Sequence, residues 1–209
     1  MAYYKYIKSN LDLRKNIPLN ENTSIALRVN VGAAFPYGNG DESTLPYEKF
    51  FFAGGSNSLR AWQPRRLGPG SYAPIDEATQ NINYDFEQPA DILLESSFEL
   101  RQKLLGIFSW AYFIDIGNSW TWYEDQTRPG SKFQLSRLPS QIAVGSGLGL
   151  RFDFSFLLVR LDVGVKVFDP AQEDGQRFVL DDFTFNNSGN TNIRVRNQPV
   201  LNIGIGYPF

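Results

Sequence analysis

The 209-residue sequence contains neither cysteine nor histidine. The lack of cysteine excludes disulfides and thiol chemistry, and the lack of histidine excludes Ser-His-Asp triads and Cys/His zinc sites. Uninterrupted apolar runs extend over only a handful of residues, too few for a membrane-spanning helix, and the opening MAYYKYIKSN lacks the apolar core of a signal peptide. Charge of one sign is not in excess, because the net charge is −2, so nothing points to a nucleic-acid partner.

Apolar and polar residues alternate with a period of two in many parts of the sequence. In the clearest stretch, Leu157, Val159 and Leu161 alternate with Arg160 and Asp162. Such alternation predicts β-strands with one apolar and one polar face. Seven segments share this pattern, namely Ile7–Arg14, Ser24–Phe35, Ile92–Lys103, Phe108–Ser119, Gln141–Asp153, Phe156–Phe168 and Val200–Phe209.

The connections between these segments alternate strictly between tight turns and long polar loops. In an antiparallel up-and-down sheet, this alternation puts all short turns at one rim and all long loops at the other, as in outer-membrane barrels. The two faces alone would also suit a soluble β-sandwich binding module. Segments of about 9 to 13 residues, however, exceed the usual strand of about 5 to 6 and match a tilted membrane crossing. The tight turns lie near residues 18–22, 104–107 and 153–156, and the long loops near 36–90, 120–140 and 169–197.

The number of strands is odd, whereas single-chain bacterial barrels normally close with an even number. An unpaired strand edge in lipid would leave backbone groups without hydrogen-bond partners. We therefore predict that residues 1–209 form the C-terminal part of an all-β, antiparallel, up-and-down transmembrane β-barrel, with further strands upstream.

The stretch Phe51–Tyr72, in the longest loop, is too rich in glycine and proline for a regular helix or strand. Composition alone leaves two interpretations open: a solvated surface loop, or a loop that folds into the barrel. Glu99 and Asp115 would point inward from adjacent strands, so their carboxylates could converge on one cation. Arg60 suits that role because a planar guanidinium satisfies two acceptors at once. We therefore predict that Arg60 is held in the lumen by Asp115, with Glu99 as second candidate, and that Phe113 packs beside the loop.

The phrases AGGSN, LRAW and LGPG in this stretch resemble the sixth extracellular loop of the BamA and TamA family of outer-membrane assembly proteins, in the bacterial surface antigen superfamily. Other motifs follow in the family's order: Phe113–Gly117 resembles its F-x-D-x-G strand, the glycines of 145–149 its glycine-rich strand, and Val159–Asp162 its R-x-D strand. The ending IGIGYPF is similar to Bacteroidetes-type members. The family's loop usually reads V-R-G-F or I-R-G-Y, and here Ala61 and Trp62 replace the glycine and the smaller aromatic.

The resemblance implies a protein of the bacterial outer membrane that assembles or inserts outer-membrane proteins or translocates proteins, with periplasmic POTRA modules upstream. Its partners would be membrane lipid, unfolded outer-membrane or secreted proteins, and accessory assembly or periplasm-spanning proteins; we expect no catalytic residue, cofactor or metal. Incoming strands would pair at a weakly zipped seam on the last strand, where Phe209 would continue the lipid-facing series. A passive or gated pore and a two-partner secretion translocator remain alternatives. The implied site residues are the loop motif Gly54, Gly55, Ser58, Leu59, Arg60, Ala61 and Trp62, its lumen partners Glu99, Phe113, Asp115 and Gly117, and the terminal-strand signal Gly204, Gly206, Tyr207 and Phe209.

Other patterns have more ordinary interpretations. Gly145, Gly147 and Gly149 do not match a nucleotide-binding fingerprint and suit the close approach of another element to the wall. Asp115 with Glu99 could perform acid–base chemistry, but nearby arginines favour charge compensation. A solvated loop, rather than a calcium site, is indicated by Glu173, Asp174, Asp181 and Asp182. An interfacial aromatic girdle is indicated by Trp110, Tyr112, Trp120, Trp122 and Tyr123.

Overall fold

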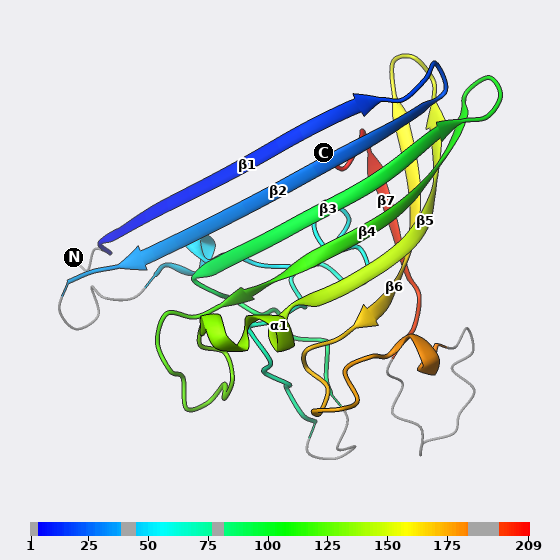
Figure 1. The fold of residues 1–209 in the computed structure, drawn as a ribbon. Helices are drawn as coiled ribbons and strands as arrows, with labels where there is room; N and C mark the ends of the chain where they lie inside the picture. Colours follow the sequence, from blue (N-terminus) through cyan, green and yellow to red (C-terminus); the bar gives the residue numbers. More distant parts are fainter. Residues whose placement is uncertain (1–3, 39–44, 77–81, 184–196) are drawn as a thin grey trace.

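The computed structural model describes residues 4–38, 45–76, 82–183 and 197–209, and these contain a single antiparallel sheet of seven strands in chain order (Figure 1). Short helical turns occur only in the connections, and no helix among the described residues is long and apolar enough to cross a membrane. The strands are β1 Tyr6–Pro18, β2 Thr23–Pro36, β3 Ile92–Lys103, β4 Phe108–Trp120, β5 Ala143–Asp153, β6 Leu158–Phe168 and β7 Val200–Ile205. The helical turns are η2 Tyr47–Lys49, η3 Leu135–Arg137, α1 Leu138–Gln141 and η4 Leu180–Asp182.

The prediction of seven antiparallel strands is confirmed, and the differences lie at strand ends. β1 continues to Pro18, the first residue of the predicted turn. β7 stops at Ile205, so the predicted continuation of this strand to Phe209 is wrong. The physical reason is Gly206, whose φ of +79° lies outside the extended conformation of a strand.

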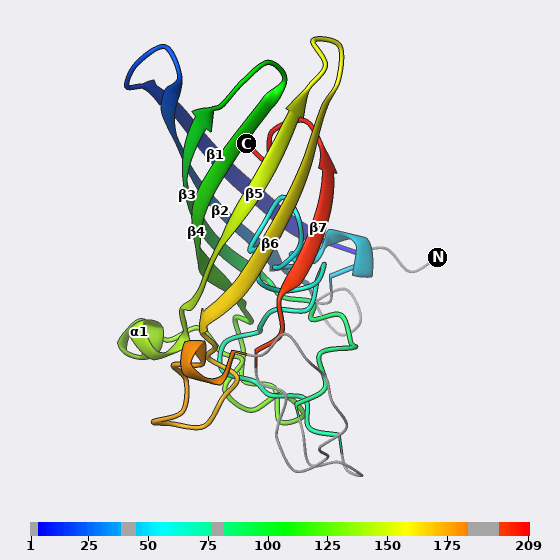
Figure 2. The same ribbon diagram turned by 90° about the vertical axis from the view of Figure 1, so that its right-hand side faces the viewer.

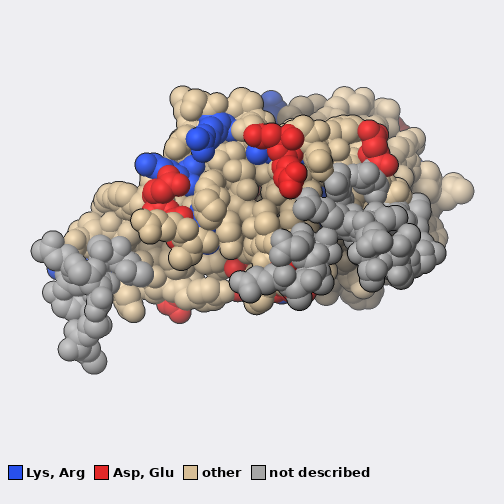
Figure 3. All heavy atoms as spheres, turned by 90° about the horizontal axis from the view of Figure 1, so that it is seen from below, with Lys and Arg blue, Asp and Glu red and all other residues tan. Residues whose placement is uncertain are grey.

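The alternation of short and long connections is also confirmed. The three hairpin turns, residues 19–22, 104–107 and 154–157, lie together at one end of the sheet, and the long connections lie at the other (Figure 1). Figure 3 looks onto the end with the long connections, where basic and acidic side chains lie beside one another on the described surface. The sheet therefore has one rim of tight turns and one rim of elaborate loops, as an outer-membrane barrel wall does.

The two faces of the sheet have opposite character. On β6, Val163 is 40% exposed, whereas Arg160 is 1% and Asp162 0% exposed. Charged side chains thus point to the concave, covered face, and apolar side chains point outward, as they do in a wall surrounded by lipid. The described strands form one sheet rather than two packed sheets, so the soluble β-sandwich interpretation is wrong.

The part of the segment between β2 and β3 that Figures 1 and 2 draw in cyan lies on the concave side of the sheet. The predicted inward-folding loop is confirmed, and the alternative of a solvated surface loop is wrong. Apolar residues of this segment supply most of the buried core, which packs on the inside of the wall as a plug. The core comprises Ala34, Leu45, Phe51, Ala53, Leu59, Ala61, Trp62, Leu67, Leu93 and Ala143.

Candidate functional site

The tip of the inward loop is a tight turn built on two glycines. Gly54 and Gly55 have φ values of +100° and +108°, a region that residues with a Cβ rarely adopt. The amide of Gly54 donates to Ser58 Oγ at 2.8 Å, and the amide of Ser58 donates to the Gly55 carbonyl at 3.0 Å. The Ser58 hydroxyl also donates to the Glu95 carboxylate of β3. Leu59 is buried in the core of the plug, and the turn places the next residue, Arg60, against the wall.

Arg60 is buried at that point and holds two carboxylates at once. Its Nε and Nη2 each donate to an oxygen of Asp115 at 2.9 Å, and its backbone N–H donates to Asp115 Oδ2 at 3.0 Å. Its Nη1 donates to Glu99 Oε2 at 2.6 Å. The guanidinium carbon lies 3.5 Å from the centre of the Phe113 ring, so the cation also stacks on an aromatic face. The structure therefore brings together the four side chains that the sequence groups.

Three further arginines bond to the carboxylates of this network. Arg151 donates to Asp162 Oδ1 at 2.6 Å and to Glu99 Oε1 at 3.1 Å. Arg101 donates to Glu99 Oε1 at 2.8 Å, and Arg160 donates to Asp162 Oδ2 at 3.3 Å. With the loop arginine, four guanidinium groups share three carboxylates inside the wall, an arrangement that compensates buried charge.

The electrostatics keep the loop arginine charged. Burial by itself would lower the pKa of the Arg60 guanidinium, but the carboxylates of Asp115, Glu99 and Asp162 outweigh it and hold that pKa above its ordinary value. A buried charge is stable only with its partners, because the loss of one leaves the other uncompensated. The ion network thus fixes where the loop tip rests.

Two glycines of the wall make room for the loop backbone. A Cβ on Gly164 would lie 2.5 Å from the Arg60 carbonyl oxygen, and a Cβ on Gly145 would lie 2.6 Å from the Cβ of Ala61. The pairing of β5 with β6 shifts register at Gly145. Ala61 has no positive φ, since the described residues other than glycine with positive φ lie elsewhere. Ala61, which replaces the glycine of the family motif, therefore fits because Gly145 opposite it has no side chain.

Trp62 holds the loop at a second place, beside the buried amine of Lys166. Lys166 Nζ lies 5.5 Å from a Trp62 ring centre and 3.5 Å from the Tyr84 ring centre, and it donates to Asp169 Oδ2 at 3.1 Å. The Tyr84 hydroxyl donates to the same oxygen at 2.6 Å. Burial, and then the negative charge of Asp169, raise the pKa of Tyr84 well above its ordinary value. An ion pair and two aromatic faces thus clamp the loop to β6.

β7 contacts the loop directly and through a neighbouring arginine. Asn202 Nδ2 donates to the Arg60 carbonyl oxygen at 2.9 Å. A Cβ on Gly204 would lie 2.8 Å from Nη2 of Arg160, so this glycine leaves room for the guanidinium. The Arg160 guanidinium in turn donates to the side chain of Asn57 in the loop. The position of β7 is therefore tied to the loop as well as to β6.

The residues after β7 turn inward, so the prediction that they continue the lipid-facing series is wrong. The Arg101 guanidinium carbon lies 4.3 Å from the ring centre of Tyr207 and 5.5 Å from that of Phe209, and Nη2 donates to the Phe209 backbone oxygen at 3.2 Å. Arg101 belongs to the inward face, because it also bonds Glu99. The left-handed backbone at Gly206 breaks the strand and redirects the chain toward that face.

Two other predicted residues have different surroundings from those expected. The atoms nearest to a Cβ on Gly117 belong to Leu94 and Glu95 of β3 rather than to the loop. Trp120 is fully buried, edge-to-face with Phe133 at 5.5 Å between ring centres. Its assignment to a lipid-facing girdle is therefore wrong, because the connection after β4 covers it.

The acidic residues after β6 lie in the connection that follows that strand. Asp174 pairs with Arg177 at 2.9 Å, and the backbone oxygen of Glu173 accepts a hydrogen bond from Gln176. The side chain of Asp182 lies outside the described residues. Among the described residues, no group of three or more acidic side chains is placed to hold a metal ion.

Sequence reasoning missed several partners of the loop, among them Arg160, Asp162 and Asn202, and it missed Arg151, which bonds two carboxylates of the network. The alternation gave the face of each residue but not its contact across the lumen. The register of β5 against β6 was the signal that could have found them. It pairs Arg151 with Arg160, and two adjacent buried cations need a carboxylate between them.

Comparisons with known proteins agree with this architecture. The model of the Omp85 superfamily domain matches residues 3–209. Among solved structures, the chain is similar in fold to the crystal structure of BamA from Haemophilus ducreyi lacking POTRA domains 1-3, with a TM-score of 0.59 and 17% sequence identity. That match covers 78% of this chain and 32% of the Haemophilus ducreyi chain. Because the family match extends over almost the whole sequence, the chain belongs to the Omp85 superfamily of the bacterial outer membrane.

Proposed function

We propose that this chain is the C-terminal part of a barrel that inserts proteins into the outer membrane or moves them across it. The observation that carries the proposal is the short last strand. β7 has 6 residues, whereas β1 has 13, so β7 can form fewer ladder hydrogen bonds with a neighbouring strand. A seam at β7 would therefore open easily, and the backbone groups freed there would pair with an incoming strand, because unpaired groups in lipid cost several kcal/mol each.

The proposed role is mechanical rather than catalytic. The partners would be membrane lipid, unfolded outer-membrane or secreted proteins, and accessory assembly or periplasm-spanning proteins. We propose further barrel strands and POTRA modules upstream, in keeping with a match that covers 32% of the Haemophilus ducreyi chain. The loop motif around Arg60 would hold the plug against β7, and thereby set how easily the seam opens.

The experiment is site-specific photocrosslinking in the full-length protein during assembly of a radiolabelled outer-membrane protein precursor. A benzoyl-phenylalanine probe at Ile203, which points outward from β7 and is 68% exposed, should capture the precursor. The same probe at Val29, outward on β2 and 42% exposed, is the matched control and should not. Equal capture at both positions, or none at Ile203 while assembly proceeds, contradicts a seam at β7.

A second measurement separates the alternatives. Depletion of the full-length protein should lower the amount of folded outer-membrane proteins. If depletion lowers only one secreted protein, the two-partner translocator is the better description. If neither changes while solute uptake falls, the protein is a pore.

A further inference from the structure

Two hairpin turns at the short-turn rim carry large apolar side chains where polar turn residues are usual. Leu105 is 83% and Phe156 89% exposed, and Leu104 and Phe154 are also exposed. We call these four residues the apolar turn tips. The third turn at the same rim has a polar tip, Asn20–Asn22, although Leu19 before it is 55% exposed. The largest apolar exposure at this rim therefore lies at the tips of the β3–β4 and β5–β6 hairpins.

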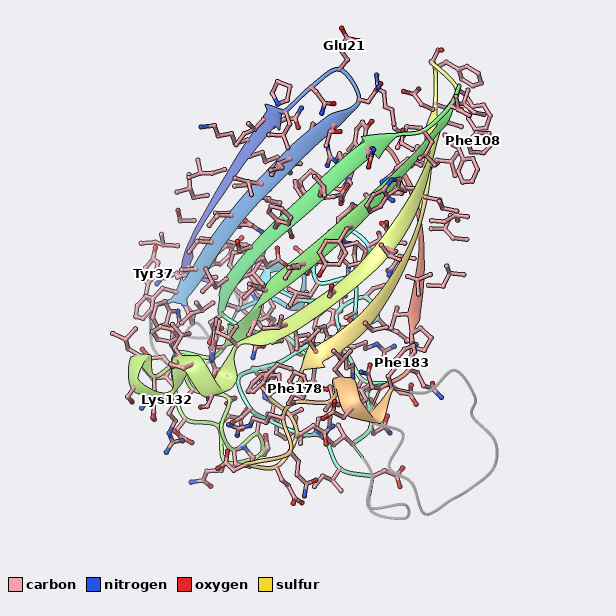
Figure 4. All side chains as sticks on the ribbon, turned by 45° about the vertical axis from the view of Figure 1, so that its right-hand side comes forward. Glu21, Tyr37, Phe108, Lys132, Phe178 and Phe183 are labelled. Carbon is pink, nitrogen blue, oxygen red and sulfur yellow. The ribbon has the colours of Figure 1, made fainter. Side chains whose placement is uncertain are left out.

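The apolar turn tips continue the outward face of the wall. Phe108 and Phe152 are register partners on β4 and β5, and their rings meet edge-to-face at 5.4 Å between centres. Phe108 is 49% exposed, and Figure 4 shows it pointing away from the sheet at the rim. Ile107 directly precedes Phe108, and Phe154 lies two residues after Phe152 with Asp153 between them, so apolar side chains continue from this aromatic pair into both turns.

The height of the apolar wall places the tips at the membrane boundary. On β4 the outward apolar side chains run from Phe108 to Ile116, eight residue steps that cover about 20 Å along the membrane normal at a tilt of about 40°. On β6 the run from Val159 to Val167 has the same length. The apolar band of such barrels is about 25 Å tall. At the far end of this row on β4, Asn118 is fully buried, so the exposed apolar row of this strand extends only toward its turn end.

We propose that the apolar turn tips insert into the interface of the inner, phospholipid leaflet of the outer membrane, at the boundary between headgroups and acyl chains. Apolar burial rather than charge drives this contact, because Lys103 and Asp153 flank the tips with opposite charges. The contact is therefore insensitive to salt. It fixes the depth of the β5–β6 hairpin, whose second strand pairs with β7.

The test uses the full-length protein, with cysteine-free background in this segment already provided by the sequence. Leu105→Cys and Phe156→Cys, each labelled with an environment-sensitive fluorophore, are compared in vesicles of phosphatidylethanolamine with phosphatidylglycerol. The matched control is Glu21→Cys on the polar turn, labelled in Figure 4. Leu148→Cys marks the middle of the wall. The quenchers are lipids with a nitroxide near the headgroup or deep in the acyl chain, and aqueous iodide.

At positions 105 and 156 we expect blue-shifted emission, stronger quenching by the shallow than by the deep nitroxide, weak quenching by iodide, and no change at high salt. Position 21 should be quenched by iodide, and position 148 by the deep nitroxide. Iodide quenching at 105 and 156 equal to that at 21 would overturn the proposal, because the tips would then lie in water. Protection from all quenchers would overturn it as well, because protein would then cover the tips.

Discussion

Replacing Arg60 by alanine should release the inward loop. Among the described residues, every hydrogen bond to the Asp115 carboxylate comes from Arg60, through its side chain and its backbone N–H. Glu99, by contrast, keeps Arg101 and Arg151. The variant Arg60→Ala therefore leaves one carboxylate buried with no cation and another still compensated.

The geometry indicates the size of the effect. Removing one partner of a buried ion pair costs about 3 to 5 kcal/mol, whereas an exposed pair contributes about 1 kcal/mol or less. Both side chains of the Arg60–Asp115 pair are 1% exposed, so the larger figure applies. At about 1.4 kcal/mol per factor of ten, the equilibrium for loop release should shift by about two orders of magnitude or more. Asp115→Asn in the same protein removes the stranded charge, so the double variant should lose about 2 kcal/mol less than the sum of the single variants.

The assay is hydrogen exchange of peptides covering residues 51–62 in the full-length protein, because amides of the loop tip exchange only when the loop opens. Arg65→Gln is the matched control: Arg65 lies in the same loop, its side chain is 52% exposed, and it meets Glu87 at 3.4 Å. Exchange in the control should stay near that of the wild type. Strictly additive effects of Arg60→Ala and Asp115→Asn, or equal acceleration in the control, would refute the reasoning.

Three other predictions use the same protein. Gly145→Ala should speed exchange at the loop tip, because its Cβ would meet that of Ala61, and Ala61→Gly in addition should restore protection; no restoration would mean that this close approach is not the constraint. Asn202→Ala should leave the Arg60 carbonyl oxygen unpaired and cost about 1 to 3 kcal/mol in urea unfolding, and an unchanged midpoint would count against the contact. Because folding raises the pKa of Tyr84, its contribution to stability is complete below about pH 10 and declines at higher pH. Tyr84→Phe should lack that part of the alkaline decline seen in unfolding curves, and an identical decline in both proteins would contradict it.

The strands of the wall and their two faces could be predicted from the sequence, because the alternation of side chains depends on each strand alone. Side chains alternate between faces at every residue of a strand, so Val163 and Asp162 are assigned to opposite faces without knowledge of their neighbours. The same alternation predicts that Asp115 and Glu99 point inward. A buried carboxylate needs a cation, and Arg60 in the loop provides it.

The contacts across the lumen could not be predicted, because they depend on curvature and on single backbone angles. The positions of Tyr207 and Phe209 keep the alternation of β7, yet the left-handed Gly206 has already ended the strand. Trp120 likewise has the position of a lipid-facing aromatic, and only the fold of the following connection shows that Phe133 covers it. In both cases the alternation of apolar and polar residues continues in the sequence, although the residues concerned no longer face the lipid.

The position of β7 depends on the loop as much as on β6. β7 pairs with β6 over the six residues Val200–Ile205, and each ladder hydrogen bond has a net value of about 1 kcal/mol. Movement of β7 away from the loop would leave the Arg60 carbonyl without Asn202, at a cost of about 1 to 3 kcal/mol, as much as one to three of those ladder bonds. Opening of the last strand and release of the loop tip are therefore coupled. In Arg60→Ala protein, hydrogen exchange should accelerate in β7 as well as in the loop, and acceleration in the loop alone would show that the two move independently.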